Sequence, residues 1–155
     1  MCLSEDNRYM RTSLVLARRA AQKGEVPVGA VIVYEGKIVG RGFNKVESGK
    51  NASLHAEMIA LRQAAKKLGR WRLSGCTIYV TLEPCAMCAG AMVLSRIDRL
   101  VYAASDPKAG ACGSVFNLAE DKKLNHRIRV VRSVMEDEAS QLLKSFFKKR
   151  RAQKI

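Results

Sequence analysis

The stretch CTIYVTLEPCAMCAGAMVLSR, residues 76–96, decides the fold because it predicts a strand that leads directly into a helix. Residues 76–82 are rich in β-branched, aromatic and aliphatic side chains, which is typical of a buried strand. Residues 84–96 favour a helix, with Pro84 near its start, where proline costs little. This helix is apolar on every side, so we expect it to be fully buried or shared with a second subunit.

The rest of the chain continues this alternation of helices and strands. Apolar residues at helical spacing predict helices over 4–24, 51–69 and about 136–151. Short apolar runs predict a hairpin over 26–43 and strands over 99–104 and 127–132. The pattern predicts a three-layer α/β/α sandwich, in which a central mixed five-stranded sheet is flanked by helices. With no linker and no internal repeat, we expect a single domain over residues 1–155.

Two of the predicted helices show signals at their ends. Asn51 or Ser53 is suited to cap the helix over 51–69, and Ser133 with Glu136 forms a capping-box pattern for the last helix. The apolar positions of the last helix, spaced i, i+3, i+4, i+7 and i+8, are Ala139, Leu142, Leu143, Phe146 and Phe147. From this spacing we expect at least one of the two phenylalanines to lie in the core.

The charge of the chain is strongly positive. There are 28 lysine and arginine residues against 14 aspartate and glutamate residues, which gives a formal net charge of +14. The excess is concentrated in residues 61–72, with five basic residues and no acid, and in residues 141–155, with six basic residues and no acid. Such clusters favour a polyanionic partner, although a solvated helix face has a similar composition.

The sequence indicates neither a membrane span nor export. No apolar stretch approaches the roughly 18 residues that a bilayer crossing requires, and residues 1–13 are acidic and polar where a signal peptide is basic and then apolar. We therefore expect a cytoplasmic protein without a membrane partner. The chain has five cysteines. In a reducing compartment, a Cys-x-x-Cys pair favours metal binding or redox chemistry over a structural disulfide.

Four side chains form the candidate site. His55 and Glu57 begin the stretch HAEMIAL, and Cys85 and Cys88 stand in PCAMC, so both motifs lie where a helix is expected to begin. Cysteine sulfur and histidine nitrogen are the usual ligands of zinc, and Cys85 and Cys88 are one helical turn apart. Three protein ligands leave the fourth position of zinc open for water, and Glu57 is then the candidate general acid and base.

The cysteine pair is also compatible with two different roles. A structural zinc ion would need a fourth protein ligand, such as Cys76 or Cys112. A thioredoxin-like redox pair would leave His55 and Glu57 without a role.

The four residues resemble the His-x-Glu and Pro-Cys-x-x-Cys signature of the zinc deaminases, a group that includes enzymes acting on tRNA. Within this cytidine and deoxycytidylate deaminase superfamily, the chain is most similar to the bacterial tRNA-specific adenosine deaminases. The resemblance extends over nearly the whole chain and is carried by GEVPVGAVIV (24–33), GFN (42–44), HAEMIALRQAA (55–65), YVTLEPCAMCAGAMVLSRI (79–97), KAGACGS (108–114), LNHR (124–127) and SQLLKSFFKKRR (140–151).

The resemblance implies a cytidine deaminase-like fold and the conversion of adenosine to inosine at the wobble position of a tRNA anticodon. The reaction would be hydrolytic, with water activated by one Zn²⁺ ion per chain. His55, Cys85 and Cys88 match the metal ligands of the family, and Glu57 matches the carboxylate that moves the protons.

The resemblance also implies residues that contact the RNA. Asn44 matches an asparagine that hydrogen-bonds the flipped nucleotide, and Asp106 matches an aspartate near the nucleotide that flanks the target. The expected partners are the anticodon stem-loop of a tRNA and a second copy of the chain in a homodimer. The alternatives are a zinc deaminase that acts on a free nucleoside or base, and a non-catalytic zinc module that binds nucleic acid.

Overall fold

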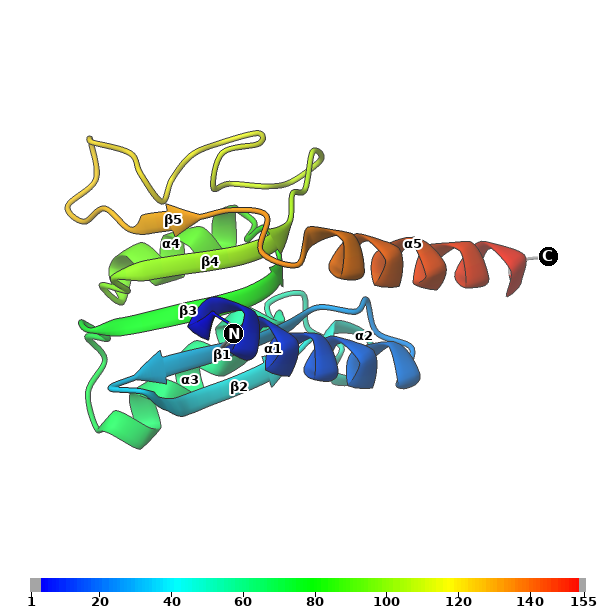
Figure 1. The fold of residues 1–155 in the computed structure, drawn as a ribbon, viewed down its shortest axis with the longest axis horizontal. Coiled ribbons are helices and arrows are strands. Elements are labelled where there is room, and N and C mark those ends of the chain that lie inside the picture. Colours follow the sequence, from blue (N-terminus) through cyan, green and yellow to red (C-terminus); the bar gives the residue numbers. More distant parts are fainter. Residues whose placement is uncertain (1–3, 154–155) are drawn as a thin grey trace.

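The computed structural model describes residues 4–153 and is built around a five-stranded sheet with the strand order β2-β1-β3-β4-β5 (Figure 1). Its strands are β1 (Gly29–Tyr34), β2 (Lys37–Phe43), β3 (Cys76–Leu82), β4 (Arg99–Ala104) and β5 (Arg129–Val131). Strand β1 is antiparallel to β2 and β3, whereas β3, β4 and β5 are mutually parallel. The predicted mixed sheet is therefore confirmed.

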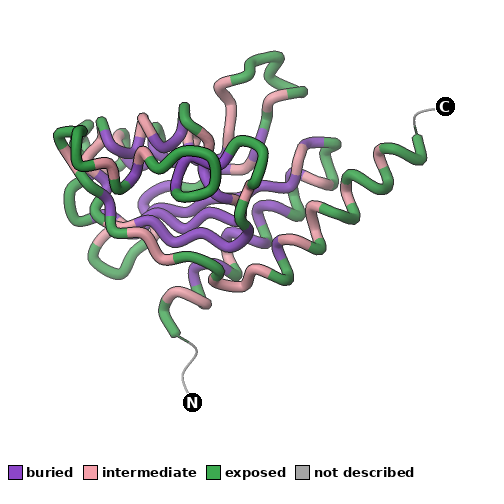
Figure 2. The backbone as a smooth tube through the Cα atoms, turned by 90° about the horizontal axis from the view of Figure 1, so that it is seen from above, coloured by how far each residue is buried: buried purple, intermediate pink, exposed green. Residues whose placement is uncertain are grey.

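The long helices cover both faces of this sheet. Helices α1 (Glu5–Gln22) and α5 (Glu136–Gln153) lie on one face, and α3 (Ala56–Leu68) and α4 (Ala86–Leu94) lie on the other. Alternate residues of β3 serve the two sides, since Tyr79 packs with α1 while Ile78 packs with α3 and α4. Buried backbone is concentrated in the strands between the helices (Figure 2). This arrangement confirms the three-layer α/β/α architecture.

Helix α3 lies against the edge strand β2 at backbone distance. A Cβ atom added at Gly42 would overlap the carbonyl oxygen of Ala56, and one added at Gly40 would overlap that of Ala60. Because these two glycines have no side chains, the start of α3 can rest directly on the sheet.

The start of α3 differs from the prediction. A short helix that the sequence did not reveal, α2 (Val46–Gly49), precedes it, and α3 itself begins only at Ala56. The residue at its N-cap position is His55, so the prediction that Asn51 or Ser53 caps this helix was wrong. The Asn51 Oδ1 atom instead accepts a hydrogen bond from the N–H of Ser53 at 2.9 Å. The side chain of Asn51 is therefore used in a local turn that ends before the helix starts, and it does not cap the helix.

The capping-box prediction for α5 was also wrong. A capping box would place Ser133 at the N-cap and Glu136 three residues inside the helix, but α5 begins at Glu136. Ser133 and Met135 both have positive φ angles, 66° and 59°. The chain therefore turns sharply between β5 and α5 and starts the helix later than the pattern indicates.

The outer half of α5 extends beyond the sheet (Figures 1 and 2). Of its residues only Ala139 is fully buried, Phe146 is half-buried and Phe147 is 40% exposed. The expectation that one of the two phenylalanines lies in the core was wrong, because no strand lies beneath this part of the helix. No helix within residues 4–153 has the combined length and apolarity that crossing a bilayer demands.

Helix α4 buries only one side within the chain. Cys88, Ala89 and Met92 are fully buried against the sheet, whereas Met87 is 37% exposed and Leu94 is 70% exposed. We expected this apolar helix to be either fully buried within the chain or shared with a second subunit. Full burial within the chain is therefore excluded.

Candidate active site

A cavity of about 290 Å³ opens at the C-terminal ends of β3 and β4. Ligand sites of α/β proteins are commonly found at this edge of the sheet. The residues predicted for the site that line the cavity are Asn44, His55, Glu57, Cys85 and Asp106. Cys88 is fully buried and is not among the residues that line the cavity. The structure thus brings together side chains that are up to 62 positions apart in the sequence.

His55, Cys85 and Cys88 form a group that fits a metal ion. The His55 Nδ1 atom is 3.6 Å from the Cys85 Sγ atom and 3.5 Å from the Cys88 Sγ atom. In a tetrahedral zinc site with usual bond lengths, a nitrogen and a sulfur ligand are about 3.6 Å apart. Both the chemistry of the donors and their spacing therefore suit zinc.

The positions of two of these residues are equivalent. His55 is the N-cap residue of α3 and Cys85 is the N-cap residue of α4, yet neither side chain accepts a hydrogen bond from its own helix. Both side chains are directed toward the shared group, and Cys88 follows one turn into α4. The positive ends of the two helix dipoles meet here, where they stabilise thiolates.

The two cysteines differ in ionisation, because the hydrogen bond to Cys85 and burial raise the pKa of the Cys88 thiol. A hydrogen bond from the Cys88 thiol, supported by the neighbouring His55, holds the pKa of Cys85 far below the usual range even though burial opposes this. The thiolate is the form of cysteine that binds metals. Cys85 is thus a ready metal ligand in this environment.

Glu57 lies in the first turn of α3 with only 3% of its surface exposed. Burial raises the pKa of Glu57 to about 7. A carboxyl group with this pKa both accepts and donates protons near neutral pH, which is the property required of a general acid and base.

Asn44 connects the cavity to the start of α3. It is 8% exposed, and its Oδ1 atom accepts a hydrogen bond from the N–H of Ala56 at 2.8 Å. Asn44 therefore caps the helix from outside, in place of His55. Since its oxygen is committed to Ala56, its NH₂ group is the donor that it can offer to the cavity.

Asp106 stands at the beginning of the loop that follows β4. Its Oδ1 atom accepts hydrogen bonds from the N–H groups of Lys108 at 3.0 Å and Ala109 at 3.2 Å. The carboxylate thus shapes the turn at the rim of the cavity, and Ala109 lines the same wall.

Two buried acids beside the cavity were missed from the sequence. Glu25 is 2% exposed, and its carboxylate accepts hydrogen bonds from the N–H groups of Glu47 at 2.9 Å and Ser48 at 2.8 Å, which anchors α2. Glu83 is also 2% exposed and holds the loop that carries Asp106. The available signal was that each acid stands in an otherwise apolar stretch, GEVPVG and TLEPC. A lone buried acid requires hydrogen-bond partners.

The remaining cysteines do not join the metal group within residues 4–153. Cys76 and Cys112 are both fully buried, but the cluster of potential ligands consists of His55, Cys85 and Cys88 alone. The fourth-ligand candidates for a structural zinc site are thus not in place. Cys2 lies outside the described residues.

The sequence of the chain matches known deaminases over nearly its full length. A family model of MafB19-like deaminases matches residues 4–151. The tRNA-specific adenosine deaminase of Bacillus subtilis (strain 168) is 45% identical over 152 residues, which cover 98% of this chain and 94% of that protein. The tRNA-specific adenosine deaminase of Aquifex aeolicus (strain VF5) is 48% identical over 143 residues, which cover 92% and 94% of the two chains.

Solved structures show the same similarity in three dimensions. A structure from a study of A-to-I editing by tRNA:A34 deaminases at the wobble position of transfer RNA has a TM-score of 0.85 and 40% identity, covering 88% of this chain and 99% of that chain. A guanine deaminase from Nitrosomonas europaea has a TM-score of 0.77 and 28% identity, covering 94% and 86%. The chain therefore belongs to the MafB19-like deaminase family, together with the tRNA-specific adenosine deaminases.

Proposed function

We propose that this protein converts adenosine to inosine at the wobble position of a tRNA anticodon. The observation that carries the proposal is the His55, Cys85 and Cys88 group at a cavity that Glu57 also lines. Relatives that are 40–49% identical over nearly the full chain are tRNA-specific adenosine deaminases, and this supports the choice of substrate. The guanine deaminase resembles the chain less, at 28% identity.

His55, Cys85 and Cys88 would hold one zinc ion per chain. When bound by three protein ligands, zinc supplies the activation of water at neutral pH. Metal binding requires a neutral imidazole and thiolates, and the environment of Cys85 already favours the thiolate.

Glu57 would move the protons of the reaction. It takes a proton from the attacking water as a bond forms between the water oxygen and C6 of adenine. It then gives this proton to N1 of the ring. Next it takes the proton of the new C6 hydroxyl and passes it to the amino group, so that the C6–N bond breaks, ammonia leaves and C6 keeps the oxygen as a carbonyl. Its position in the buried wall of the cavity excludes bulk water from these transfers.

Asn44 and Asp106 would recognise the nucleotides. The NH₂ group of Asn44 would donate a hydrogen bond to the flipped nucleotide, since its oxygen already accepts one from the N–H of Ala56. Asp106 also lines the cavity, where it would contact the nucleotide next to the target.

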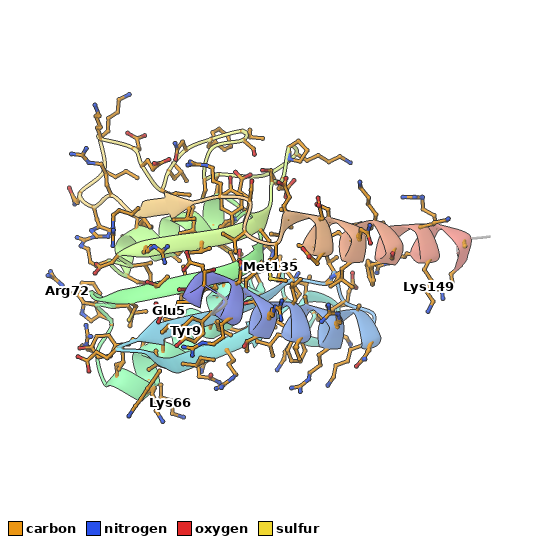
Figure 3. All side chains as sticks on the ribbon, in the orientation of Figure 1. Glu5, Tyr9, Lys66, Arg72, Met135 and Lys149 are labelled. Atoms are coloured by element: carbon orange, nitrogen blue, oxygen red, sulfur yellow. The ribbon has the colours of Figure 1, made fainter. Side chains whose placement is uncertain are left out.

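The basic helix α5 supports RNA over a free nucleoside as the substrate. Arg150 forms an ion pair with Glu47 at 3.5 Å, and Glu47 lines the cavity, so the basic end of α5 is connected to the rim of the site. Lys148, Lys149 and Arg151 are exposed, and Lys149 lies on the part of α5 that projects from the sheet (Figure 3). These positive charges can bind the phosphates of RNA, whereas a free nucleoside has no phosphate for them to bind.

The decisive experiment compares substrates for the zinc-loaded protein. A transcribed anticodon stem-loop with adenosine at the wobble position should be deaminated far faster than free adenosine, cytidine or guanine, because remote phosphates contribute binding energy. Inosine is measured by nucleoside analysis of the digested RNA. Equal rates on the stem-loop and on free adenosine would favour a nucleoside deaminase.

A homodimer would cover the exposed side of α4. Met87, Gly90, Ala91 and Leu94 lie along one stripe of this helix, and Leu94 is 70% exposed. Exposed apolar stripes of this kind are typical of subunit interfaces. Light scattering should report twice the chain mass for the wild type and a smaller mass for Leu94→Glu. A monomeric wild type would contradict the proposal.

We infer that the protein acts in the cytoplasm. The proposed substrate is found there, and unpaired cysteines such as the metal-binding thiolates are maintained in a reducing compartment.

A further inference from the structure

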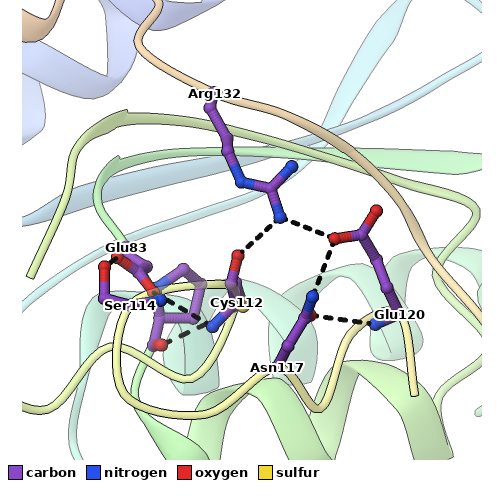
Figure 4. Close-up of polar contacts among 7 residues, drawn as sticks. Glu83, Cys112, Ser114, Asn117, Glu120 and Arg132 are labelled. Carbon is purple, nitrogen blue, oxygen red and sulfur yellow. Dashed lines mark hydrogen bonds and ion pairs between the residues drawn. The ribbon is translucent and has the colours of Figure 1, made fainter.

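Glu83 is a buried carboxylate whose oxygen atoms are used entirely within the protein fold. It is 2% exposed and directly follows β3. Its Oε1 atom accepts a hydrogen bond from the N–H of Asp106 at 3.0 Å. Oε1 also accepts a hydrogen bond from the hydroxyl of Ser114, and Oε2 accepts hydrogen bonds from the N–H groups of Cys112 at 3.1 Å and Ser114 at 3.0 Å (Figure 4). Four donors offset the cost of burying this charge.

These donors belong to the two ends of one loop. Asp106 begins the segment 106–114, and Cys112 and Ser114 end it, so a single carboxylate closes the loop on itself. The middle of the loop also lies against Glu83, because a Cβ atom added at Gly110 would overlap the Glu83 carboxyl group. The loop therefore wraps around Glu83 without spare space.

The same loop is aligned with the metal ligands. Its Ala111 N–H donates to the carbonyl of Pro84 at 2.8 Å, and Gly110 pairs with Cys85 in an isolated antiparallel bridge. From the other side, Arg132 donates to the carbonyl of Cys112 at 2.9 Å (Figure 4). The wall of the cavity that contains Asp106 and Ala109 is thus set at a fixed distance from Cys85.

We propose that Glu83 is a positioning residue that fixes the 106–114 loop against the metal site and thereby determines how tightly the cavity binds its nucleotide. This inference rests on the proposed function. Glu83 acts through the loop and takes no part in the proton transfers, so its loss should weaken substrate binding more than it slows the chemical step.

The test uses the zinc-loaded full chain with Glu83→Gln, which keeps the size of the side chain but places an NH₂ group among N–H donors. We expect one zinc per chain, a KM for the anticodon stem-loop raised about tenfold or more, and a kcat within a few-fold of wild type. Amide hydrogen exchange should accelerate at residues 106, 112 and 114.

A milder pair of variants keeps the test decisive if Glu83→Gln does not fold. Ser114→Ala removes one donor and leaves the backbone N–H groups, so the KM should rise by a few-fold, while Ser114→Thr retains the hydroxyl and should stay near wild type. Asp6→Asn is the matched control, because it also converts an acid to its amide but lies on the other face of the sheet. This control should change neither the KM nor the exchange of the loop.

Two results would overturn the inference. Unchanged exchange at residues 106, 112 and 114 in Glu83→Gln would show that Glu83 does not hold the loop. Faster exchange with an unchanged KM would show that the loop does not position the substrate. If the wild-type protein fails to deaminate the stem-loop, the proposed function fails, and the exchange measurement with stem-loop titration still decides the role of Glu83.

Discussion

Glu57 in the first turn of α3 and Cys88 in the first turn of α4 are buried, whereas the outer half of α5 extends beyond the sheet (Figure 1). His55 and Glu57 lie on a helix whose start rests on Gly42 and is capped by Asn44. In α5 only Ala139 is fully buried. Bond-making chemistry needs positions held within about 0.5 Å, but attraction between charges acts over about 8–10 Å in physiological salt. The positions of the site residues must therefore be fixed precisely, whereas the charges of α5 can act without a fixed position.

The largest effect should come from removing a metal ligand from the rigid region. In Cys85→Ser we expect zinc content to fall from one per chain toward zero and turnover to fall to background. The melting temperature should fall as well, because the ion connects the starts of two helices. Elemental analysis and thermal unfolding measure these changes. Cys112→Ser is the control, with zinc retained, and a Cys85→Ser protein that keeps its zinc would remove Cys85 from the ligand set.

The next effect separates proton transfer from metal binding within the same region. Glu57→Gln should lower kcat about 10²–10⁴-fold because it removes the general acid and base, while zinc stays at one per chain. Binding of the stem-loop, measured by fluorescence anisotropy, should change little. Loss of zinc from this variant would mean that Glu57 is a ligand, contrary to its proposed role.

Substitutions in the outer half of α5 should weaken RNA binding and leave kcat unchanged. Changing Lys148, Lys149 and Arg151 to glutamine should weaken stem-loop binding and reduce the slope of log K against log salt by about 2–3, since each lost phosphate contact removes about 0.7–0.9. At saturating RNA, kcat should be unchanged. Arg150 is left intact because it pairs with Glu47.

A matched set of basic residues controls for net charge in this experiment. Lys66, Lys67 and Arg72 carry the same total charge, and Lys66 and Arg72 lie at the end of the molecule opposite Lys149 (Figure 3). Changing these three to glutamine should leave the salt slope nearly intact. Equal losses from both sets would show that net charge alone attracts the RNA.

The smallest expected effect lies outside both regions. Arg99 donates to both carboxylate oxygens of Asp6 at 2.8 and 2.6 Å and thereby lowers the pKa of Asp6 below 3.8. Because the folded pKa is the lower one, this pair contributes stability above about pH 4 and loses it as the pH falls through the folded pKa. Asp6→Asn should cost about 1 kcal/mol at pH 7.

Chemical denaturation across pH measures this contribution. The difference between Asp6→Asn and wild type should shrink below pH 4. A difference that stays constant with pH would assign the loss to packing and not to the ion pair.

The sequence predicts where helices and strands lie better than it predicts what packs against them. Periodicity and residue composition located the five strands and the four long helices of residues 4–153, because both are local properties of the sequence. Periodicity also named an apolar face for α5 but could not reveal that the sheet ends before Phe146 and Phe147. The four-residue helix α2 was missed since VESG offers no full turn of apolar spacing.

The candidate site shows the same division. The grouping of His55, Cys85 and Cys88 could be predicted because histidine and cysteine in this pattern are typical of zinc ligands. Glu57 could be predicted to line the same cavity because it stands two positions after His55. The supporting acids Glu25 and Glu83 could not be predicted, because their partners are backbone N–H groups of distant loops. Nearly every residue carries a backbone N–H group, so the sequence does not show which of these groups a buried acid will contact.

The contact of Gly40 and Gly42 with α3 determines which mutations the active site tolerates. Both overlaps that a methyl group would create are with backbone atoms of α3 and not with a movable side chain. An alanine at either position would therefore raise the whole helix, and a displacement of about 1 Å at a reacting group can cost about 100-fold in rate. These two positions contain no chemical group, yet they set the height of His55 and Glu57 above the sheet. In a survey of all single substitutions, they should be as intolerant as the proposed metal ligands His55, Cys85 and Cys88.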